Sequence, residues 1–208
     1  MKHMFTTRID HRVGIINNVT MLAVLLAGAA VIRERERGTL DHLLVMPLSP
    51  LEIGMAKVWS NGLVITAAAG LSLWLVVRGI LGVPIAGSVP LFLVGVALYL
   101  FYATALGLLL GTLARSMPQL GLLFILLVLP MVLLSGGSTP FESMPRPLQL
   151  VMLAFPSTHF VAFAQAILYR GAGFSIVWPQ FAATAGIGAL VLAAALLRFR
   201  AAVVGTAS

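Results

Sequence analysis

Long, uninterrupted apolar runs constrain this chain more than any other feature of its sequence. A helix needs about 20 consecutive apolar residues to cross a bilayer, and five segments of the 208-residue chain approach or exceed that length. Hydrophobic residues make up 60% of the chain and charged residues only 9%, whereas a soluble domain carries about 25% charged residues. The sequence therefore predicts an all-α, polytopic helical membrane protein with a single transmembrane domain over residues 1–208. The predicted transmembrane helices cover residues 13–32, 53–77, 90–114, 119–134 and 178–197.

The connections between these runs differ in length and in proline content. The last connection, residues 135–177, contains four prolines. Within it, residues 148–155 and 159–169 are predicted to form short helices that lie in the membrane interface or dip into it as re-entrant helices. Ahead of the second run, Ser49 and Glu52 have the spacing of a capping box, which marks the start of that helix.

The net charge of +7 makes this a strongly basic protein. In a soluble protein this balance suggests a nucleic-acid partner, but here Arg and Lys lie at the ends of apolar runs, where membrane helices place them. We therefore predict contact with the lipid bilayer and no nucleic-acid partner. Five spans put residues 33–57, residues 114–118 and the C-terminus on one side, with seven basic residues against six on the other. Without residues 1–12 the count is seven against three, which favours a cytoplasmic location for the first side.

Several kinds of chemistry lack the residues they need. The chain has two lysines, Lys2 and Lys57, and neither follows a glycine, so it has no P-loop and no ATPase site of its own. It contains no HExxH motif and no His/Cys cluster, so no metal site is predicted. The six carboxylates lie outside the apolar runs or at their edges, which argues against an ion-coupled carrier and an intramembrane aspartyl protease. We therefore assign no catalytic residue and no bound cofactor.

Two alternative classes of function stay open at this point. One is an intramembrane serine protease, for which Ser135, Ser138 and His159 are the candidate nucleophiles and base. The other is a stand-alone membrane channel or assembly factor, which would tolerate charge changes at residues 33–44.

A charged run, RERERGTL, directly follows the first apolar segment at residues 33–40. Gly38 ends the first helix, and Thr39 caps a second, short helix over residues 40–46. That short helix carries three leucines on one face. The run is either a snorkelling anchor followed by a loop or an interfacial helix that docks a cytoplasmic partner, and the residues alone favour neither interpretation.

Small and polar residues inside the apolar runs have two interpretations each. Gly107 and Gly111 form a GxxxG motif, which Ala103 extends at the same spacing. Such a face packs helices closely, either within one chain or between two copies. The polar residues line a substrate path or, as we favour, join helices by hydrogen bonds. These polar residues are Asn17, Asn18, Ser60, Asn61, Tyr99, Tyr102 and Thr104. The substrate-path candidates among them are Asn17, Asn18, Asn61 and Tyr102.

Four stretches together resemble the ABC-2 type permeases, the membrane subunits of bacterial ABC exporters, which include drug-export systems. The most specific is Glu-Arg-Gly-Thr-Leu at residues 36–40, followed by Pro-Leu-Ser-Pro. The second is Ser-Gly-x-x-x-Pro-x-Glu-Ser-Met-Pro at residues 135–145. The resemblance covers nearly the whole chain, from about residue 13 to residue 200. The full stretches are IRERERGTLDHLLVMPLSPLEIGMAK, ARSMPQLGLL, LSGGSTPFESMP and PSTHFVAFAQAILYRGAG.

The resemblance implies a division of labour between subunits. Residues 35–46 would form the cytoplasmic coupling element that sits on a separate ATPase subunit, and that ATPase would bind ATP and Mg. Two permeases and two ATPases would form the working unit in the bacterial inner (plasma) membrane, with residues 33–57 inside and re-entrant helices after Ser135 at the outer face. An apolar path with few charges suits the export of a hydrophobic drug or a lipid-like compound. The residues predicted to contact the ATPase are Arg35, Glu36, Arg37, Gly38, Thr39, Leu40, Leu43 and Leu44.

The sequence departs from the family pattern at its beginning. Family members typically have six spans, and many drug exporters carry a large extracytoplasmic domain after the first span. This sequence begins just before what would be the second span. We therefore expect that the first span and that domain are missing, through truncation, a misplaced start at Met1 or division of the gene.

Overall fold

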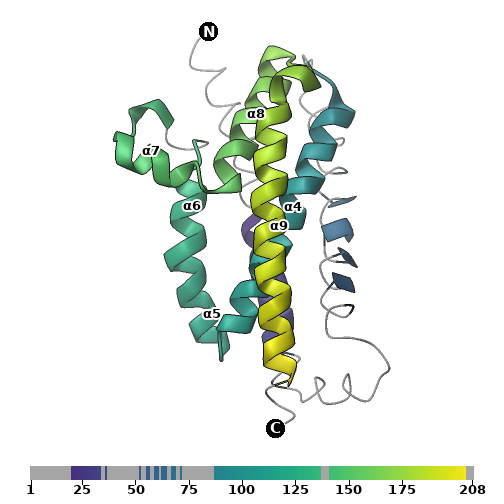
Figure 1. Ribbon diagram of the computed structural model, residues 1–208, viewed down its shortest axis with the longest axis vertical. Helices are drawn as coiled ribbons and strands as arrows, with labels where there is room; N and C mark the ends of the chain where they lie inside the picture. Colours follow the sequence, from purple (N-terminus) through teal and green to yellow (C-terminus); the bar gives the residue numbers. More distant parts are fainter. Residues whose placement is uncertain are drawn as a thin grey trace.

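The computed structural model describes residues 20–33, 87–136 and 141–204, together with Glu36 and short helical pieces between residues 52 and 71 (Figure 1). Every regular element in these described residues is a helix, which confirms the predicted all-helical class. The helices are Thr20–Arg33, α4 (Val89–Leu113), α5 (Met117–Leu123), the π-helix η2 (Phe124–Val128), α6 (Leu129–Leu133), the 3-10 turn η3 (Phe141–Ser143), α7 (Arg146–Met152), α8 (Pro156–Arg170) and α9 (Phe174–Val204).

Two of the described helices are long and apolar enough to cross a membrane. They are α4, with a mean hydropathy of 2.2, and the Phe174–Ala201 part of α9, with a mean hydropathy of 1.9. The predicted runs 90–114 and 178–197 are thus confirmed as helices. Helices α7 and α8 form a third candidate span, a pair bent by 91°. The count of five spans stays a prediction, because the run 53–77 lies largely outside the described residues.

The predicted run 119–134 is an apolar helix, Met117–Leu133, with a π-helical turn in its middle. In that turn the N–H of Leu129 donates to the carbonyl of Phe124, five residues earlier. Pro130 follows directly. Because a proline has no N–H to donate and its ring crowds the carbonyl four residues earlier, we attribute the widened turn to this proline.

Helix α4 lies at the centre of the bundle and packs against α8 and α9 (Figure 1). An aromatic column joins the three helices. The Tyr99 ring stacks on Phe160 with the ring centroids 4.2 Å apart. The Phe163 ring then lies 5.1 Å from Phe160 and 4.5 Å from Phe181. Gly95 of α4 permits this approach, since a Cβ atom there would come within 2.4 Å of the Phe163 ring.

Residues 159–169, predicted to lie in the interface or to dip into it as a re-entrant helix, belong to α8, and the 91° bend between α7 and α8 is compatible with a re-entrant pair. Phe163 and Ile167 of α8 are buried in the core that α4 and α9 share. Helix α7 differs, because it exposes Leu150 and Val151. Helix α8 is therefore a core helix of the bundle, and α7 is the peripheral member of the bent pair.

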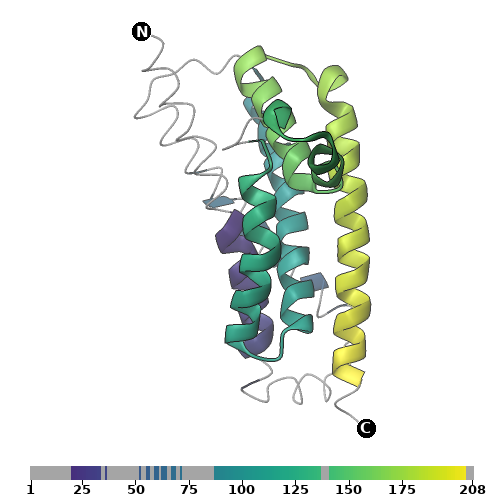
Figure 2. The ribbon, with the colours of Figure 1, turned by 90° about the vertical axis from the view of Figure 1, so that its left-hand side faces the viewer.

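Among the residues that the structure describes, the two ends of the bundle differ in their number of basic residues. One buried cluster contains Val31, Leu108, Ala195 and Phe199, so the end of the Thr20–Arg33 helix, the end of α4 and the end of α9 lie together (Figure 2). We call this the arginine-rich end. Its described basic residues are Arg33, Arg115, Arg198 and Arg200, and those of the opposite end are Arg146 and Arg170.

Candidate functional site

The segment predicted to contact an ATPase begins at the arginine-rich end. Of its eight predicted contact residues the structure describes Glu36, which is helical and exposed. Arg33, almost one turn earlier, is also exposed, and its Nε donates a hydrogen bond to the Ala29 carbonyl at 3.3 Å. The other predicted contacts lie outside the described residues, and they are Arg35, Arg37, Gly38, Thr39, Leu40, Leu43 and Leu44.

The small residues of the GxxxG motif face the Thr20–Arg33 helix of the same chain. A Cβ atom on Gly107 would lie 2.5 Å from the Val24 carbonyl oxygen. A Cβ atom on Gly111 would lie 2.7 Å from the Gly28 carbonyl oxygen. Ala103 is fully buried. In this structure the motif brings two helix backbones of one chain into direct contact.

Two of the polar residues singled out from the sequence, Tyr102 and Thr104, are paired with neighbouring groups of the bundle. The Tyr102 hydroxyl donates to the Met131 sulfur at 3.3 Å, and the Thr104 hydroxyl donates to the Leu100 carbonyl at 2.8 Å. Tyr102 is buried among core side chains, so here it joins α4 to α6. The other substrate-path candidates, Asn17, Asn18 and Asn61, lie outside the described residues.

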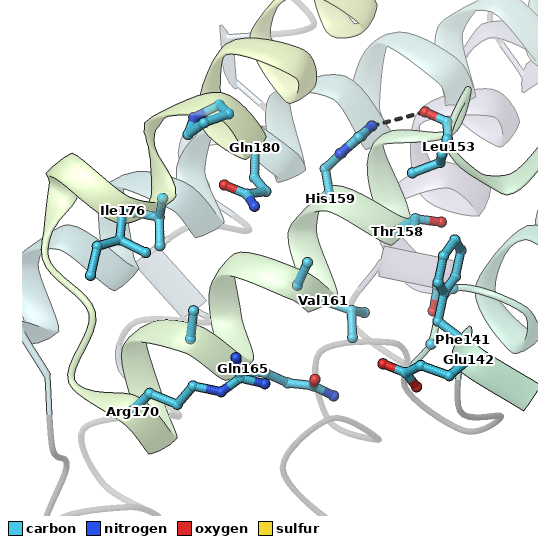
Figure 3. Close-up of a pocket in the computed structure, with 16 residues that line it drawn as sticks. Phe141, Glu142, Leu153, Thr158, His159, Val161, Gln165, Arg170, Ile176 and Gln180 are labelled. Carbon is cyan, nitrogen blue, oxygen red and sulfur yellow. Dashed lines mark hydrogen bonds between the residues drawn. The ribbon is translucent and has the colours of Figure 1, made fainter. Parts of the chain in front are cut away.

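A pocket of about 750 Å³ opens where the α7–α8 corner, α8 and the start of α9 meet (Figure 3). Apolar side chains form much of its wall, and polar side chains from four segments line it: the turn that follows α6, η3, α8 and α9. Two of these polar residues, Ser135 and His159, were predicted from the sequence as candidates, but Gln165 and Gln180 were not. Their position in the sequence could have indicated them, because glutamine is uncommon inside apolar helices. The polar lining residues are Ser135, Glu142, Thr158, His159, Gln165, Arg170 and Gln180.

Hydrogen bonds at the start of α8 build the corner that forms one side of this pocket. The Thr158 hydroxyl donates to the Met152 carbonyl at 2.9 Å, and His159 Nε2 lies 2.8 Å from the Leu153 carbonyl oxygen. A carbonyl oxygen only accepts, so Nε2 carries the hydrogen of this bond. These bonds satisfy carbonyl groups at the end of α7 that have no partner inside that helix. The chain can therefore turn by 91° there.

The serine and histidine of the protease alternative do not form a catalytic pair here. The Ser135 hydroxyl donates to the Val132 carbonyl at 2.7 Å, and His159 Nε2 points to the Leu153 carbonyl (Figure 3). A serine nucleophile requires a hydrogen bond to its base. The other candidate serine, Ser138, lies outside the described residues.

A second, smaller pocket of about 320 Å³ lies between α4 and the helical pieces near residue 60. The Trp59 and Phe101 rings meet edge to face there, with centroids 5.6 Å apart. No lining side chain among the described residues carries a charge, so none would orient a polar ligand. The lining residues are Trp59, Gly62, Leu63, Ala67, Ala97 and Phe101.

A bundle of apolar helices that exposes large apolar side chains, with helices long and apolar enough to cross a membrane, defines an integral membrane protein. The chain belongs to the ABC-2 type transporter family, because the model of that family matches residues 6–169. The resemblance inferred from the charged run and the Ser-Gly-x-x-x-Pro pattern is thereby confirmed.

The named relatives are bacterial permeases. The chain is 64% identical over 186 residues to the inner membrane transport permease YhhJ of Escherichia coli, which covers 89% of this chain and 50% of that protein. It is 32% identical over 187 residues to the probable multidrug ABC transporter permease YbhR of Escherichia coli, covering 89% of this chain and 50% of the relative. It is 30% identical over 159 residues to the similarly named YbhS, covering 74% of this chain and 41% of the relative. The chain thus spans about half the length of the curated relatives it matches.

Proposed function

We propose that this chain is the membrane-spanning permease part of an ABC-type exporter in the bacterial inner membrane. It moves substrate outward with energy from ATP that a separate ATPase subunit hydrolyses. The observation that carries this proposal is the arginine-rich end. Four described basic residues lie there against two at the other end, which supports a cytoplasmic location, and the predicted coupling segment leaves the bundle at that same end.

The packing suggests how movement at the coupling segment reaches the rest of the protein. The Thr20–Arg33 helix precedes that segment and meets α4 through the backbone contacts at Gly107 and Gly111. The same helix meets α5 at Gly28, where a Cβ atom would lie 2.9 Å from the Leu120 side chain. Since close-packed helices transmit a displacement rather than absorb it, a tilt of the first helix moves α4 and α5 with it.

The partners follow from the same proposal. The working unit contains two ATPases and two permeases, the second being another copy or a homologue, and ATP and Mg are held by the ATPases. The names of YbhR and YbhS and the few charges inside the spans support a hydrophobic drug or a lipid-like compound as substrate. This chain acts as a transport subunit and binds no nucleotide itself.

The absence of cysteine from the chain allows a direct test. A His42→Cys variant carrying a short photo-crosslinker is expected to capture an ATPase with a P-loop in native membranes. Adding Leu43→Asp is expected to remove this capture and to lower export at least tenfold without reducing the amount inserted, because an aspartate would disrupt the apolar docking face. Gly38→Pro is expected to uncouple export in the same way.

Leu150→Asp is the matched control, since Leu150 is an exposed leucine of α7, far from the arginine-rich end. This variant is expected to keep ATPase capture. Labelling of residue 42 from outside the cell, capture of lipid alone, or normal export by the Leu43→Asp variant would contradict the coupling role and favour the stand-alone class.

A further inference from the structure

Three polar side chains in the wall of the large pocket have already used a donor hydrogen on the protein itself. A hydroxyl group has one hydrogen to donate and a neutral imidazole has one N–H. Ser135, Thr158 and His159 direct theirs to backbone carbonyls at 2.7 Å, 2.9 Å and 2.8 Å. The hydroxyl hydrogens of Ser135 and Thr158 and the Nε2 hydrogen of His159 are therefore engaged within the protein.

Gln180 adds an acceptor that lacks a partner. Its side chain points from the second turn of α9 into the pocket (Figure 3), and its Oε1 atom is buried without a hydrogen bond. A buried carbonyl oxygen left unpaired is unfavourable, so this atom would favour a ligand that brings a hydrogen-bond donor into the pocket.

Glu142 supplies a negative charge at the rim. The 3-10 turn η3 that carries it is fastened to α7, because Gln149 Nε2 donates to the Phe141 carbonyl at 3.2 Å and to the Met144 carbonyl at 2.9 Å. The carboxylate points into the pocket, and the side chain of Gln165 lies between it and Arg170 (Figure 3). Within the described residues Glu142 has no ion-pair partner, so its charge is available to a ligand.

Arg170 is the one arginine that lines this pocket, and it has another source of stabilisation. It is the last residue of α8, where Gly171 closes the helix in the left-handed conformation at φ 64°. A cation at a helix C-terminus is stabilised by the helix dipole. Glu142, on the other side of Gln165, is the acidic residue among the lining residues and the one that would attract a cation.

We propose that this pocket binds an amphipathic amine. The ammonium group donates to the Glu142 carboxylate and to the acceptors of the wall, and the apolar body of the ligand rests on side chains such as Leu153, Val161 and Ile176. The volume of about 750 Å³ lies within the range of small-molecule sites. Binding requires neither ATP nor an ATPase, so this site is independent of the proposed export function.

The test compares ligands that share one apolar body. The full chain is placed in phosphatidylcholine nanodiscs, and binding of 1-naphthylmethylamine, its N,N,N-trimethyl derivative, 1-naphthylmethanol and 1-naphthylacetate is measured by calorimetry, with empty nanodiscs subtracted. The primary amine is expected to bind at least tenfold more tightly than the other three. The trimethyl derivative tests the acceptor argument, since it keeps the positive charge and loses every N–H donor.

Variants locate the binding in the pocket. Glu142→Gln is expected to weaken amine binding at least tenfold, because a charge-assisted hydrogen bond is lost. Gln180→Met, which keeps the length of the side chain and removes the acceptor, is expected to weaken it about threefold or more. Arg170→Gln is expected to leave it unchanged or to tighten it up to about threefold, as a like charge is removed.

Arg146→Gln is the matched control, because it changes the charge of the same end by one unit at an exposed residue outside the pocket. It is expected to alter binding less than twofold. Equal binding of amine and alcohol, tighter binding of naphthylacetate, or unchanged binding in the Glu142→Gln variant would overturn the proposal. Glu142 is exposed, so this variant is expected to fold even if Gln180→Met does not.

Discussion

Helices α4 and α9 have similar mean hydropathies, 2.2 and 1.9, but very different surroundings. In the most apolar window of each helix, 67% of the residues of α4 are buried inside the protein, against 22% for α9. Helix α4 is enclosed by other helices, whereas α9 buries one stripe and exposes the rest. Hydropathy therefore identifies both as membrane helices but does not reveal whether protein or lipid surrounds them.

The surroundings of the glycines differ between α4 and α9. Gly95, Gly107 and Gly111 of α4 each lie where a Cβ atom would come within 2.4 to 2.7 Å of another segment. Gly186 of α9 lies where a Cβ atom would meet nothing within 4 Å. Since lipid is as apolar as a leucine side chain, close packing rather than the hydrophobic effect holds membrane helices together. The glycines of α4 thus contribute to stability in a way that those of the exposed face of α9 do not.

Replacing Gly107 by alanine is the strongest test of this difference. The new methyl group would lie 2.5 Å from a backbone oxygen, that of Val24, and a backbone cannot move aside as a flexible side chain does. We expect Gly107→Ala to lower the free energy of unfolding by about 3 kcal/mol, measured by steric trapping or by denaturant titration in mixed micelles.

Gly186→Ala is the control for this substitution on α9. It is expected to be neutral or to raise the free energy of unfolding by up to about 1 kcal/mol, since alanine is the better helix former. If the two alanine variants had equal stability, the close contact between α4 and the Thr20–Arg33 helix would be wrong.

A matched pair of leucines gives the second comparison. Leu100 of α4 is 1% exposed and Leu190 of α9 is 72% exposed. We expect Leu100→Ala to lower the free energy of unfolding by about 2 kcal/mol. This is near the lower limit for buried leucines, because a leucine that leaves the core for lipid does not lose the free energy of transfer out of water. Leu190→Ala is expected to change it by less than about 0.5 kcal/mol. Equal losses in the same assay would mean that α9 is covered by protein on both faces.

Sequence reasoning located the membrane helices better than their environments. The run 90–114 matches α4 to within one residue. The run 178–197 lies inside α9, which extends beyond it at both ends, from Phe174 to Val204. The burial of α8 could not be predicted from its own sequence, because it depends on the bend after α7, where the Thr158 and His159 side chains pair with the carbonyls of Met152 and Leu153.

Less of the candidate site than of the fold could be predicted from the sequence. The sequence offers Ser135 and His159 as a possible catalytic pair, but each side chain forms a hydrogen bond to a nearby backbone carbonyl, that of Val132 and that of Leu153 respectively. Gln180 of α9 and Glu142 of η3 line one pocket because separate segments of the chain meet at α8. No sequence spacing encodes that approach. The predicted ATPase contacts, Glu36 among them, stay a prediction.

The smallest expected effect compares one hydroxyl group from each helix. The Tyr102 hydroxyl reaches from α4 to the Met131 sulfur at 3.3 Å, whereas the Thr184 hydroxyl donates to the Gln180 carbonyl of its own helix at 2.8 Å. We expect Tyr102→Phe to lower the free energy of unfolding by about 0.5 kcal/mol, as is usual for hydrogen bonds between membrane helices. Thr184→Val is expected to be neutral, because the helix already satisfies that carbonyl. If Thr184→Val lowered the free energy of unfolding more than Tyr102→Phe, polar groups of α9 would stabilise the bundle as those of α4 do. The similar hydropathies of the two helices would then reflect similar contributions to stability.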